Sequence, residues 1–222
     1  GIAPTRWATH GFPNTVNAHP HLSGSSVALV HNGIIENHEE LRDELQAAGY
    51  EFGSDTDTEV MVHLIHSLVD EGNDLFTAVR RAVKRLQGAY AIAVVSAAEP
   101  GVIVGARAGS PLVLGIGFQE HYLASDIHPL LSVTNRFVYL DEGDVVRLDT
   151  TTYDVRDRDD KPVRRQVVEA DLAADAVQRG AYRHYMQKEI FEQPHAVAET
   201  LEGRIVADRV LPNIFGVGAD AI

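Results

Sequence analysis

The chain has 222 residues, 45% of them hydrophobic, and a formal net charge of −13, which together predict a folded protein with a substantial core and exclude a disordered one. The acidic charge opposes binding to a nucleic-acid backbone. Since no window approaches the roughly 20 apolar residues of a membrane span, and no signal peptide is evident, we expect a cytoplasmic protein with neither nucleic acid nor membrane as a partner.

Residues 1–22 are rich in Gly, Pro, Asn and His and predict a loop. The apolar run 25–30 predicts a buried strand. Three amphipathic stretches follow and predict helices over 37–48, 60–69 and 75–86. Asn37 is expected to cap the first helix, because a glutamate stands three residues later. Thr56 and Glu59 repeat this capping pattern before the second helix.

Further along the chain, β-branched and aromatic runs separated by turn signals predict strands over 89–96, 102–107, 111–114, 122–125, 137–140 and 145–148. Residues 153–155 and 163–168 flank a charged turn and predict a peripheral hairpin. Helices grouped early and strands grouped late predict an α+β architecture with antiparallel sheets. Residues 1–179 are expected to form one domain, and residues 180–222 a linker whose helix is interrupted near Pro194.

Arg6, the Asn32-Gly33 pair and Asp57 together offer the polar groups that an amino acid with a side-chain carbonyl needs. The Arg6 guanidinium can hold a carboxylate by two charge-assisted hydrogen bonds. Asn32 and Gly33 follow the apolar run 27–30 after one residue, so we expect them at a strand end, with donors facing a developing oxyanion. Asp57, at the start of a predicted helix, offers a carboxylate to a substrate ammonium.

Each of these residues also has a plain structural explanation. An arginine commonly lies on the surface, and Trp7 is more often a packing residue than a gate. Asp57 is explained equally by complementing a helix N-terminus. Asn-Gly is a strong turn signal, so Asn32 and Gly33 can form a turn.

The chain contains no cysteine, which excludes disulfides, thiolate metal sites and a cysteine nucleophile within these residues. His19 and His21 flank a proline in a loop, and His63 and His66 are expected on the polar face of the second helix. None of these histidines has the spacing of a three-ligand zinc site. We therefore expect no metal.

Five runs of sequence carry a family resemblance: Thr5-Arg6-Trp7-Ala8-Thr9-His10-Gly11, Asn17-Ala18-His19-Pro20-His21, His31-Asn32-Gly33-Ile34-Ile35-Glu36-Asn37, Ser54-Asp55-Thr56-Asp57-Thr58-Glu59 and Tyr182-Arg183-His184-Tyr185-Met186-Gln187-Lys188-Glu189. They resemble the glutamine-hydrolysing domain of the glutamine:fructose-6-phosphate aminotransferase (isomerising), or glucosamine-6-phosphate synthase, family. The resemblance covers essentially the whole chain. It is specific, because other class II glutamine amidotransferases share the His-Asn-Gly element but carry a different sequence in place of the first run and lack Tyr-Arg-His-Tyr-Met.

The resemblance implies an N-terminal-nucleophile hydrolase fold, a four-layer αββα sandwich in which two antiparallel sheets lie between helix layers. It also implies how glutamine is held. Arg6 and His10 would bind the substrate carboxylate, with Thr9 supporting their loop. Asp57 would take the α-ammonium.

The resemblance further implies that Asn32 and the Gly33 N–H form the oxyanion hole. Trp7 would be the gate of an ammonia channel, and residues 180–188 the hinge towards sugar isomerase domains. The family's nucleophile is an N-terminal cysteine whose own amine acts as the base. Because this chain begins at Gly1 and has no cysteine, we expect the opening segment and the first strands of the fold to be absent, and the chain itself to be inactive.

In the intact protein, the resemblance implies glutamine hydrolysis that supplies ammonia to fructose 6-phosphate and yields glucosamine 6-phosphate. It implies a homodimer that needs no cofactor. Two alternatives stay open. The chain could belong to another class II amidotransferase, such as an amidophosphoribosyl or asparagine-forming enzyme, or it could be a non-catalytic glutamine-binding module.

Overall fold

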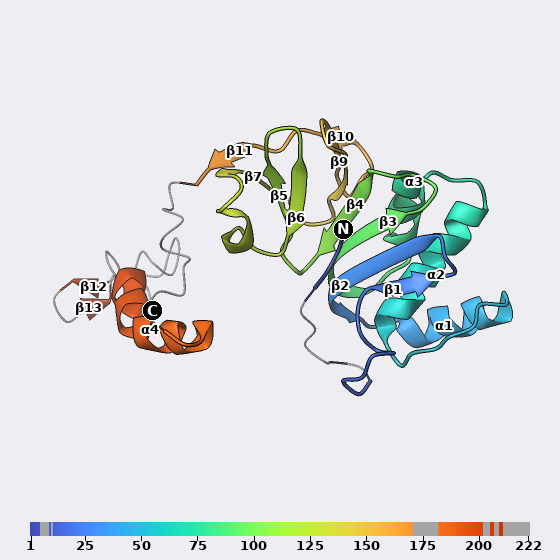
Figure 1. Cartoon of the computed structure of the whole chain (residues 1–222), viewed down its shortest axis with the longest axis horizontal. Helices are drawn as coiled ribbons and strands as arrows, with labels where there is room; N and C mark the ends of the chain where they lie inside the picture. The colour runs from blue at the N-terminus through green and yellow to red at the C-terminus, as the bar shows by residue number, and fades with distance from the viewer. Residues whose placement is uncertain (5–8, 10, 171–181, 202–204, 207–208, 211–222) are drawn as a thin grey trace, which may run out of the picture. The chain divides into compact units, whose positions relative to one another are not determined.

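The structure is a computed structural model that describes residues 1–4, 9, 11–170, 182–201, 205–206 and 209–210. The chain divides into two compact units, Gly1–Ala173 and Ala174–Ile222 (Figure 1). The described part of the second unit contains helix α4 (Tyr185–Leu201) and a hairpin of β12 (Ile205–Val206) and β13 (Arg209–Val210). No helix in the described ranges is long and apolar enough to cross a membrane.

The described residues of the first unit begin with two strands, continue with three helices and then form strands and one 3₁₀ turn. In chain order the elements are β1 (His21–Ser23), β2 (Val27–Ile35), α1 (His38–Ala47), α2 (Asp57–Asp70), α3 (Leu75–Ala82), β3 (Gly88–Ser96), β4 (Ile103–Ala108), β5 (Val113–Ile116), β6 (His121–Ala124), the 3₁₀ turn η1 (His128–Leu130), β7 (Arg136–Tyr139), β8 (Val145–Leu148), β9 (Tyr153–Arg156), β10 (Pro162–Val163) and β11 (Val167–Glu169). This is the predicted α+β order.

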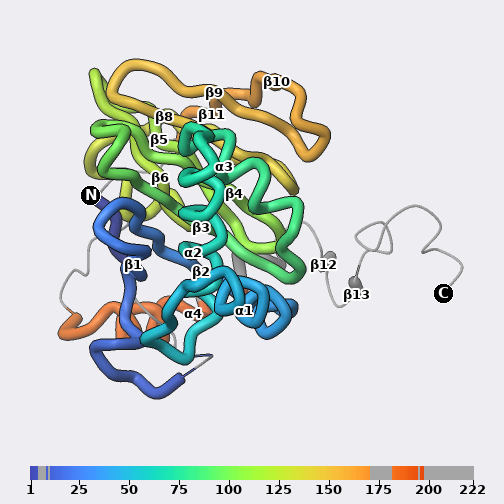
Figure 2. Tube along the Cα trace, turned by 90° about the vertical axis from the view of Figure 1, so that its right-hand side faces the viewer, coloured from blue at the N-terminus to red at the C-terminus, as the bar shows by residue number. Residues whose placement is uncertain are grey.

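The strands of the first unit form two antiparallel sheets. The larger has seven strands in the order β1-β2-β3-β4-β8-β9-β10, and the smaller has four in the order β11-β7-β5-β6. Helices α1, α2 and α3 cover one face of the larger sheet, and the smaller sheet packs on its other face (Figures 1 and 2). The two antiparallel sheets and the helix layer on the larger sheet are as expected. The expected second helix layer does not occur among the described residues of the first unit.

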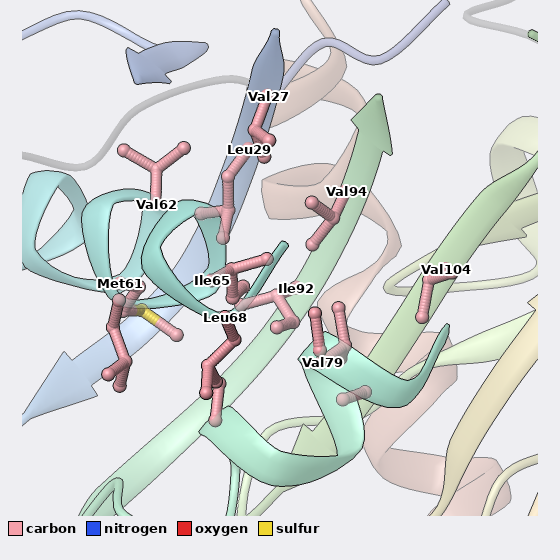
Figure 3. Close-up of a cluster of buried hydrophobic side chains, with 14 of the residues drawn as sticks. Val27, Leu29, Met61, Val62, Ile65, Leu68, Val79, Ile92, Val94 and Val104 are labelled. Carbon is pink, nitrogen blue, oxygen red and sulfur yellow. The ribbon is translucent and has the colours of Figure 1, made fainter. Parts of the chain in front are cut away.

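Two apolar cores hold these layers together. The first lies between the helices and the larger sheet, where Leu29, Ile65, Val79, Ile92 and Val104 are buried (Figure 3). The second lies between the two sheets and contains residues of both, including Leu114, Val138, Val146 and Leu148. Alternating residues of β3 serve both cores, since Ile92 faces the helices and Ala91 faces the smaller sheet.

Helix α2 is more deeply buried than its sequence pattern predicted. His63 was expected on a polar face, but only 5% of it is exposed. Because β1 packs against α2, His63 Nδ1 lies 2.8 Å from the hydroxyl of Ser23, and His66 Nδ1 lies 2.6 Å from the same oxygen. The expectation for His63 was therefore wrong, because it ignored the strand that covers this side of the helix.

Three other local expectations were also wrong. Helix α3 ends at Ala82 and not near residue 86, because the following turn is tied to the first residues after β2. Helix α4 continues through Pro194, so the proline does not interrupt it. The expected second arm of the hairpin, 163–168, splits between the two sheets: β10 pairs with β9, whereas β11 pairs with β7.

Candidate active site

Asn32 and Gly33 lie inside strand β2 and not at its end. In the register of β2 with β3, Asn32 stands opposite Ala91 and Gly33 opposite Tyr90, and the pairing continues to Ile35. The turn explanation of Asn-Gly and the expected strand-end position are both wrong. The apolar run predicted only the first half of the strand, because His31, Asn32 and Gly33 interrupt the apolar pattern without interrupting the ladder.

The hydrogen-bond pattern of β2 shows which way the Gly33 N–H points. Residues of an antiparallel pair alternate between facing the partner strand and facing away from it. The Glu36 N–H donates to Gln87 (2.8 Å) and the Ala97 N–H donates to Ser26 (2.7 Å), so the even-numbered residues of β2 face β3. The odd-numbered residues, including Gly33, therefore face the opposite side.

The two neighbours of Gly33 on that side confirm the direction. The His31 N–H donates to Nδ1 of His19 at 3.4 Å, and the Ile35 N–H donates to Oδ2 of Asp57 at 2.8 Å. Among the described residues, the pairing of β1 with β2 ends at Leu29, so no described strand covers this stretch of β2. The Gly33 N–H thus lies at a strand edge that no described strand covers, between two N–H groups that bind side chains.

Glycine is required at position 33 by close packing. Its φ is +140°, and a Cβ there would lie 2.0 Å from the carbonyl oxygen of Ala89. No side chain can be placed at that distance from a backbone oxygen. The residue opposite, Tyr90, is buried; burial and then the negative charge of Glu142 raise its pKa to about 12, so its hydroxyl stays neutral.

The Asn32 side chain points into a cavity between the two sheets. Side chains alternate across a strand, and Leu29 and Ile35 face the helices, so Asn32 faces the smaller sheet. The cavity has a volume of about 550 Å³ and is lined mainly by apolar side chains, with Ser125 and Asn32 among its polar groups. Asn32 is exposed to this space, so its amide can donate to a ligand there.

Asp57 begins helix α2, as predicted, and its carboxylate reaches the edge of β2. It is buried, with 3% of its surface exposed. Its Oδ2 accepts the Ile35 N–H, and His31 Nδ1 lies 4.0 Å away. The carboxylate therefore lies on the same side of β2 as the Gly33 N–H. A ligand that contacts Asn32, Gly33 and Asp57 has to lie along this strand edge, because Asn32 projects between the sheets and Asp57 comes from the helix layer.

A closed set of hydrogen bonds fixes the groups around this edge. Because a backbone N–H can only donate, His19 Nδ1 accepts from His31 and its proton is on Nε2. That Nε2–H lies 3.2 Å from the Thr58 hydroxyl, which lies 3.0 Å from Nδ1 of His31. The bonds thus return to the residue where they began. They hold the loop around His19 against both β2 and α2.

The loop before Asp57 is held by two side chains of opposite charge. The guanidinium of Arg42 donates to the carbonyl oxygens of Ser54 (3.1 Å) and Thr56 (2.9 Å), and it stacks on the ring of Phe52. The carboxylate of Glu59 accepts the N–H groups of Gly53 (2.9 Å) and Ser54 (2.7 Å). Arg42 thus donates to the carbonyl oxygens of this loop, and Glu59 accepts from its N–H groups.

These contacts keep Glu59 ionised. Burial favours the neutral acid, but contacts with His63, the Ser54 hydroxyl and the two loop N–H groups outweigh it and lower the pKa of Glu59 from its ordinary value of 4.5 to about 2. Thr56 accepts the Glu59 N–H at 3.3 Å, which confirms the predicted helix cap. The Glu59 side chain binds the preceding loop and not the cap residue, so the reciprocal half of the pattern was wrong.

The remaining predicted site residues are placed as follows. Thr9 is exposed and lies in a bend. Arg6, Trp7 and His10 lie outside the residues that the structure describes. Within the described ranges, no group of three His, Cys, Asp or Glu side chains could hold a metal ion.

Sequence reasoning gave no role to Asn17, Arg42 or His19. Asn17 and His19 stand in one of the runs that carried the resemblance, which was the available signal. Their contacts became visible only with the fold.

A family model described as "Glutamine amidotransferase domain" matches residues 14–132, more than half of the chain. The chain belongs to this family. Two solved structures share the fold: the glutamine phosphoribosylpyrophosphate amidotransferase of B. subtilis complexed with ADP and GMP (TM-score 0.58, 23% identity, 70% of this chain and 34% of that one) and an allosteric regulatory enzyme of purine biosynthesis (TM-score 0.52, 24% identity, 64% and 31%).

The chain is more similar in sequence to glutamine–fructose-6-phosphate aminotransferases (isomerizing). The Pseudomonas putida protein of that name is 55% identical over 216 residues, which are 97% of this chain and 35% of that protein. The Haemophilus influenzae protein is 50% identical over 222 residues, 100% of this chain and 36% of that protein. The chain therefore spans about a third of the length of these relatives.

Proposed function

We propose that the chain is the glutamine-hydrolysing part of a glutamine:fructose-6-phosphate aminotransferase. Glutamine would be cleaved to glutamate and ammonia, and the ammonia would convert fructose 6-phosphate to glucosamine 6-phosphate outside these 222 residues. The similarity to relatives of that name over nearly the whole chain supports this assignment. We also propose a cytoplasmic homodimer, with residues 180–222 as the hinge towards the sugar-converting part.

The observation that carries the proposal is the Gly33 N–H at an edge of β2 that no strand among the described residues covers, beside the buried carboxylate of Asp57. A backbone donor at such an edge can stabilise a carbonyl oxygen that becomes negative. Asp57 would bind the substrate ammonium with Oδ1, since Oδ2 already accepts the Ile35 N–H. The glutamine side-chain amide would lie along the strand edge, where Asn32 also donates.

The reaction would proceed by covalent catalysis. A cysteine thiolate outside these residues would attack the glutamine amide carbon, and its own amine would accept and return the proton. Asn32 and the Gly33 N–H would stabilise the tetrahedral oxyanion, ammonia would leave, and water would hydrolyse the glutamyl thioester. Arg6 and His10 would bind the α-carboxylate with Thr9 supporting them, and Trp7 would close the route taken by ammonia.

The test is to purify the full-length gene product and to measure glutamate and glucosamine 6-phosphate formation from glutamine and fructose 6-phosphate. We expect both products in equal amounts. Glutamate without glucosamine 6-phosphate would indicate another class II amidotransferase, and glutamine binding without turnover would indicate a binding module. Either result would refute the proposal.

A further inference from the structure

Asn17 connects two loops that have separate tasks in the proposed function. The first loop, residues 11–17, directly follows the segment with Arg6 and His10 that is proposed to bind the α-carboxylate. The second, residues 53–56, directly precedes Asp57, which is proposed to bind the α-ammonium. Asn17 is buried, with 1% of its surface exposed.

Both ends of the Asn17 amide are used between these loops. Its Oδ1 accepts the Asp55 N–H at 3.0 Å, and its Nδ2 donates to the Phe12 carbonyl at 3.0 Å. Its own backbone N–H donates to Oδ1 of Asn14 at 2.8 Å, which closes the first loop on itself. One side chain thus bonds the backbone of each loop.

These two hydrogen bonds of the Asn17 amide form the joint between the loops, and Gly11 packs against it. Its φ is +72°, and a Cβ there would lie 2.5 Å from Nδ2 of Asn17 and 3.0 Å from Cβ of Asp55. The backbone of the first loop therefore lies directly against both Asn17 and Asp55, the two residues joined by the Asp55 N–H bond to Oδ1 of Asn17. Only glycine fits at this distance and this φ.

The second loop is itself held in place by hydrogen bonds from two helices. Its carbonyls are held by Arg42 and its N–H groups by Glu59, and both of these side chains come from helices of the core layer. Fixing Asn17 to Asp55 therefore fixes the first loop relative to the helix that carries Asp57.

We propose that Asn17 is a positioning residue that sets the separation between the carboxylate-binding and ammonium-binding ends of the glutamine site. This inference rests on the proposed function. Two groups on one ligand bind together strongly only when the site holds their partners at the matching distance. Loosening the joint leaves each partner intact but weakens their simultaneous binding.

The test compares three amides as substrates of the full-length gene product by ammonia release. L-Glutamine carries both α-groups, 4-carbamoylbutanoate lacks the ammonium, and 4-aminobutanamide lacks the carboxylate. For Asn17→Ala we expect kcat/KM for L-glutamine to fall about tenfold or more, mainly through KM, because simultaneous binding is lost. For the two single-ended amides we expect a change of less than about twofold, because each of them uses one partner only. Gly11→Ala should give the same pattern.

Asn73→Ala is the matched control, because the Asn73 amide also donates to a backbone carbonyl, that of Leu68, but at the far end of α2 from Asp57. It should leave the ratio of L-glutamine to single-ended amides unchanged. Hydrogen exchange followed by mass spectrometry should show faster exchange in the segment 53–57 of Asn17→Ala.

Three results would overturn the inference. If kcat/KM of Asn17→Ala falls equally for all three amides, Asn17 has a structural role only. If kcat/KM for L-glutamine is unchanged, Asn17 does not contribute to the site. Wild-type protein that releases no ammonia from L-glutamine would refute the proposed function itself, and the inference with it.

Discussion

Single residues of this site owe their positions to long-range contacts. Gly33 has to be a glycine because the Ala89 carbonyl oxygen of β3 would lie 2.0 Å from its Cβ, and the buried Asp57 carboxylate accepts the Ile35 N–H from another element. Neither contact can be seen in the neighbouring sequence. The residue types by themselves predicted an amino acid with a side-chain carbonyl as the ligand, because an arginine, an amide and a carboxylate match the groups of such a ligand. Glutamine was named only by the family resemblance.

Replacing Asn32 tests the oxyanion proposal at this scale. If its amide stabilises the transition state, Asn32→Ala should lower kcat for glutamate release by about 10² to 10³ and change KM by only a few fold. Since Asn32 is exposed to the cavity and the backbone ladder of β2 remains, the melting temperature should change little. Steady-state assays and thermal melts of the full-length gene product measure both. Ser125→Ala, which lines the same cavity, is the control and should keep its kcat. An unchanged kcat in Asn32→Ala would remove Asn32 from the catalytic residues.

Acid stability tests the role of Glu59. Its pKa of about 2 in the folded protein lies below the ordinary value of 4.5, so its stabilisation is complete above that ordinary value and is lost as the pH falls towards 2. The shift corresponds to a free energy on the order of 3 kcal/mol. Urea unfolding of the wild type and Glu59→Gln between pH 7 and pH 2 should therefore show a difference that disappears at the acid end.

The exposed Glu71 is the control for this measurement, since it pairs with Arg81 at the surface. Glu71→Gln should change the free energy of unfolding by less than about 0.5 kcal/mol at any pH. A difference between Glu59→Gln and wild type that persists unchanged at pH 2 would show that the Glu59 charge does not stabilise the fold.

At the scale of elements, periodicity predicted most helices and strands because their core-facing residues repeat at the helix or strand period. It was wrong where a side chain has a distant partner. His63 looks polar on a helical wheel but lies under β1, and Asn32-Gly33 looks like a turn but continues β2. Asn37 looks like a helix cap, but the structure shows no capping bond from its side chain.

The side chain of Asn37 connects two elements that are distant in the sequence. Its Nδ2 donates to the Arg85 carbonyl (2.9 Å) and its Oδ1 accepts the Gln87 N–H (3.0 Å), so it ties α1 to the start of β3. Aspartate is as good a helix cap as asparagine but lacks the amide donor. Asn37→Asp should therefore destabilise the protein by about 1 kcal/mol in urea unfolding, because the Arg85 carbonyl loses its donor. Equal or greater stability would make Asn37 an ordinary cap.

At the scale of the whole molecule, the packing of the layers brings Asp57 next to the stretch of β2 that contains Asn32 and Gly33, which are distant from it in the sequence. Strand β2 lies between the helix layer that carries Asp57 and the smaller sheet that faces Asn32, and its edge presents the Gly33 N–H to both. The proposed covalent step needs a nucleophile at this edge. No cysteine occurs among the 222 residues, and a serine or threonine without an adjacent base is a weak nucleophile.

The 222 residues by themselves should therefore bind L-glutamine without hydrolysing it. Calorimetric titration should show saturable binding, because the proposed partners of the carboxylate, the ammonium and the carbonyl oxygen all lie within the chain. Incubation with glutamine should release no glutamate above the uncatalysed rate, whereas the full-length gene product should turn over. D-Glutamine is the control ligand, since exchanging its α-groups prevents both from meeting their partners at once. Turnover by the 222 residues at the rate of the full-length protein would show that a nucleophile other than cysteine acts at the β2 edge.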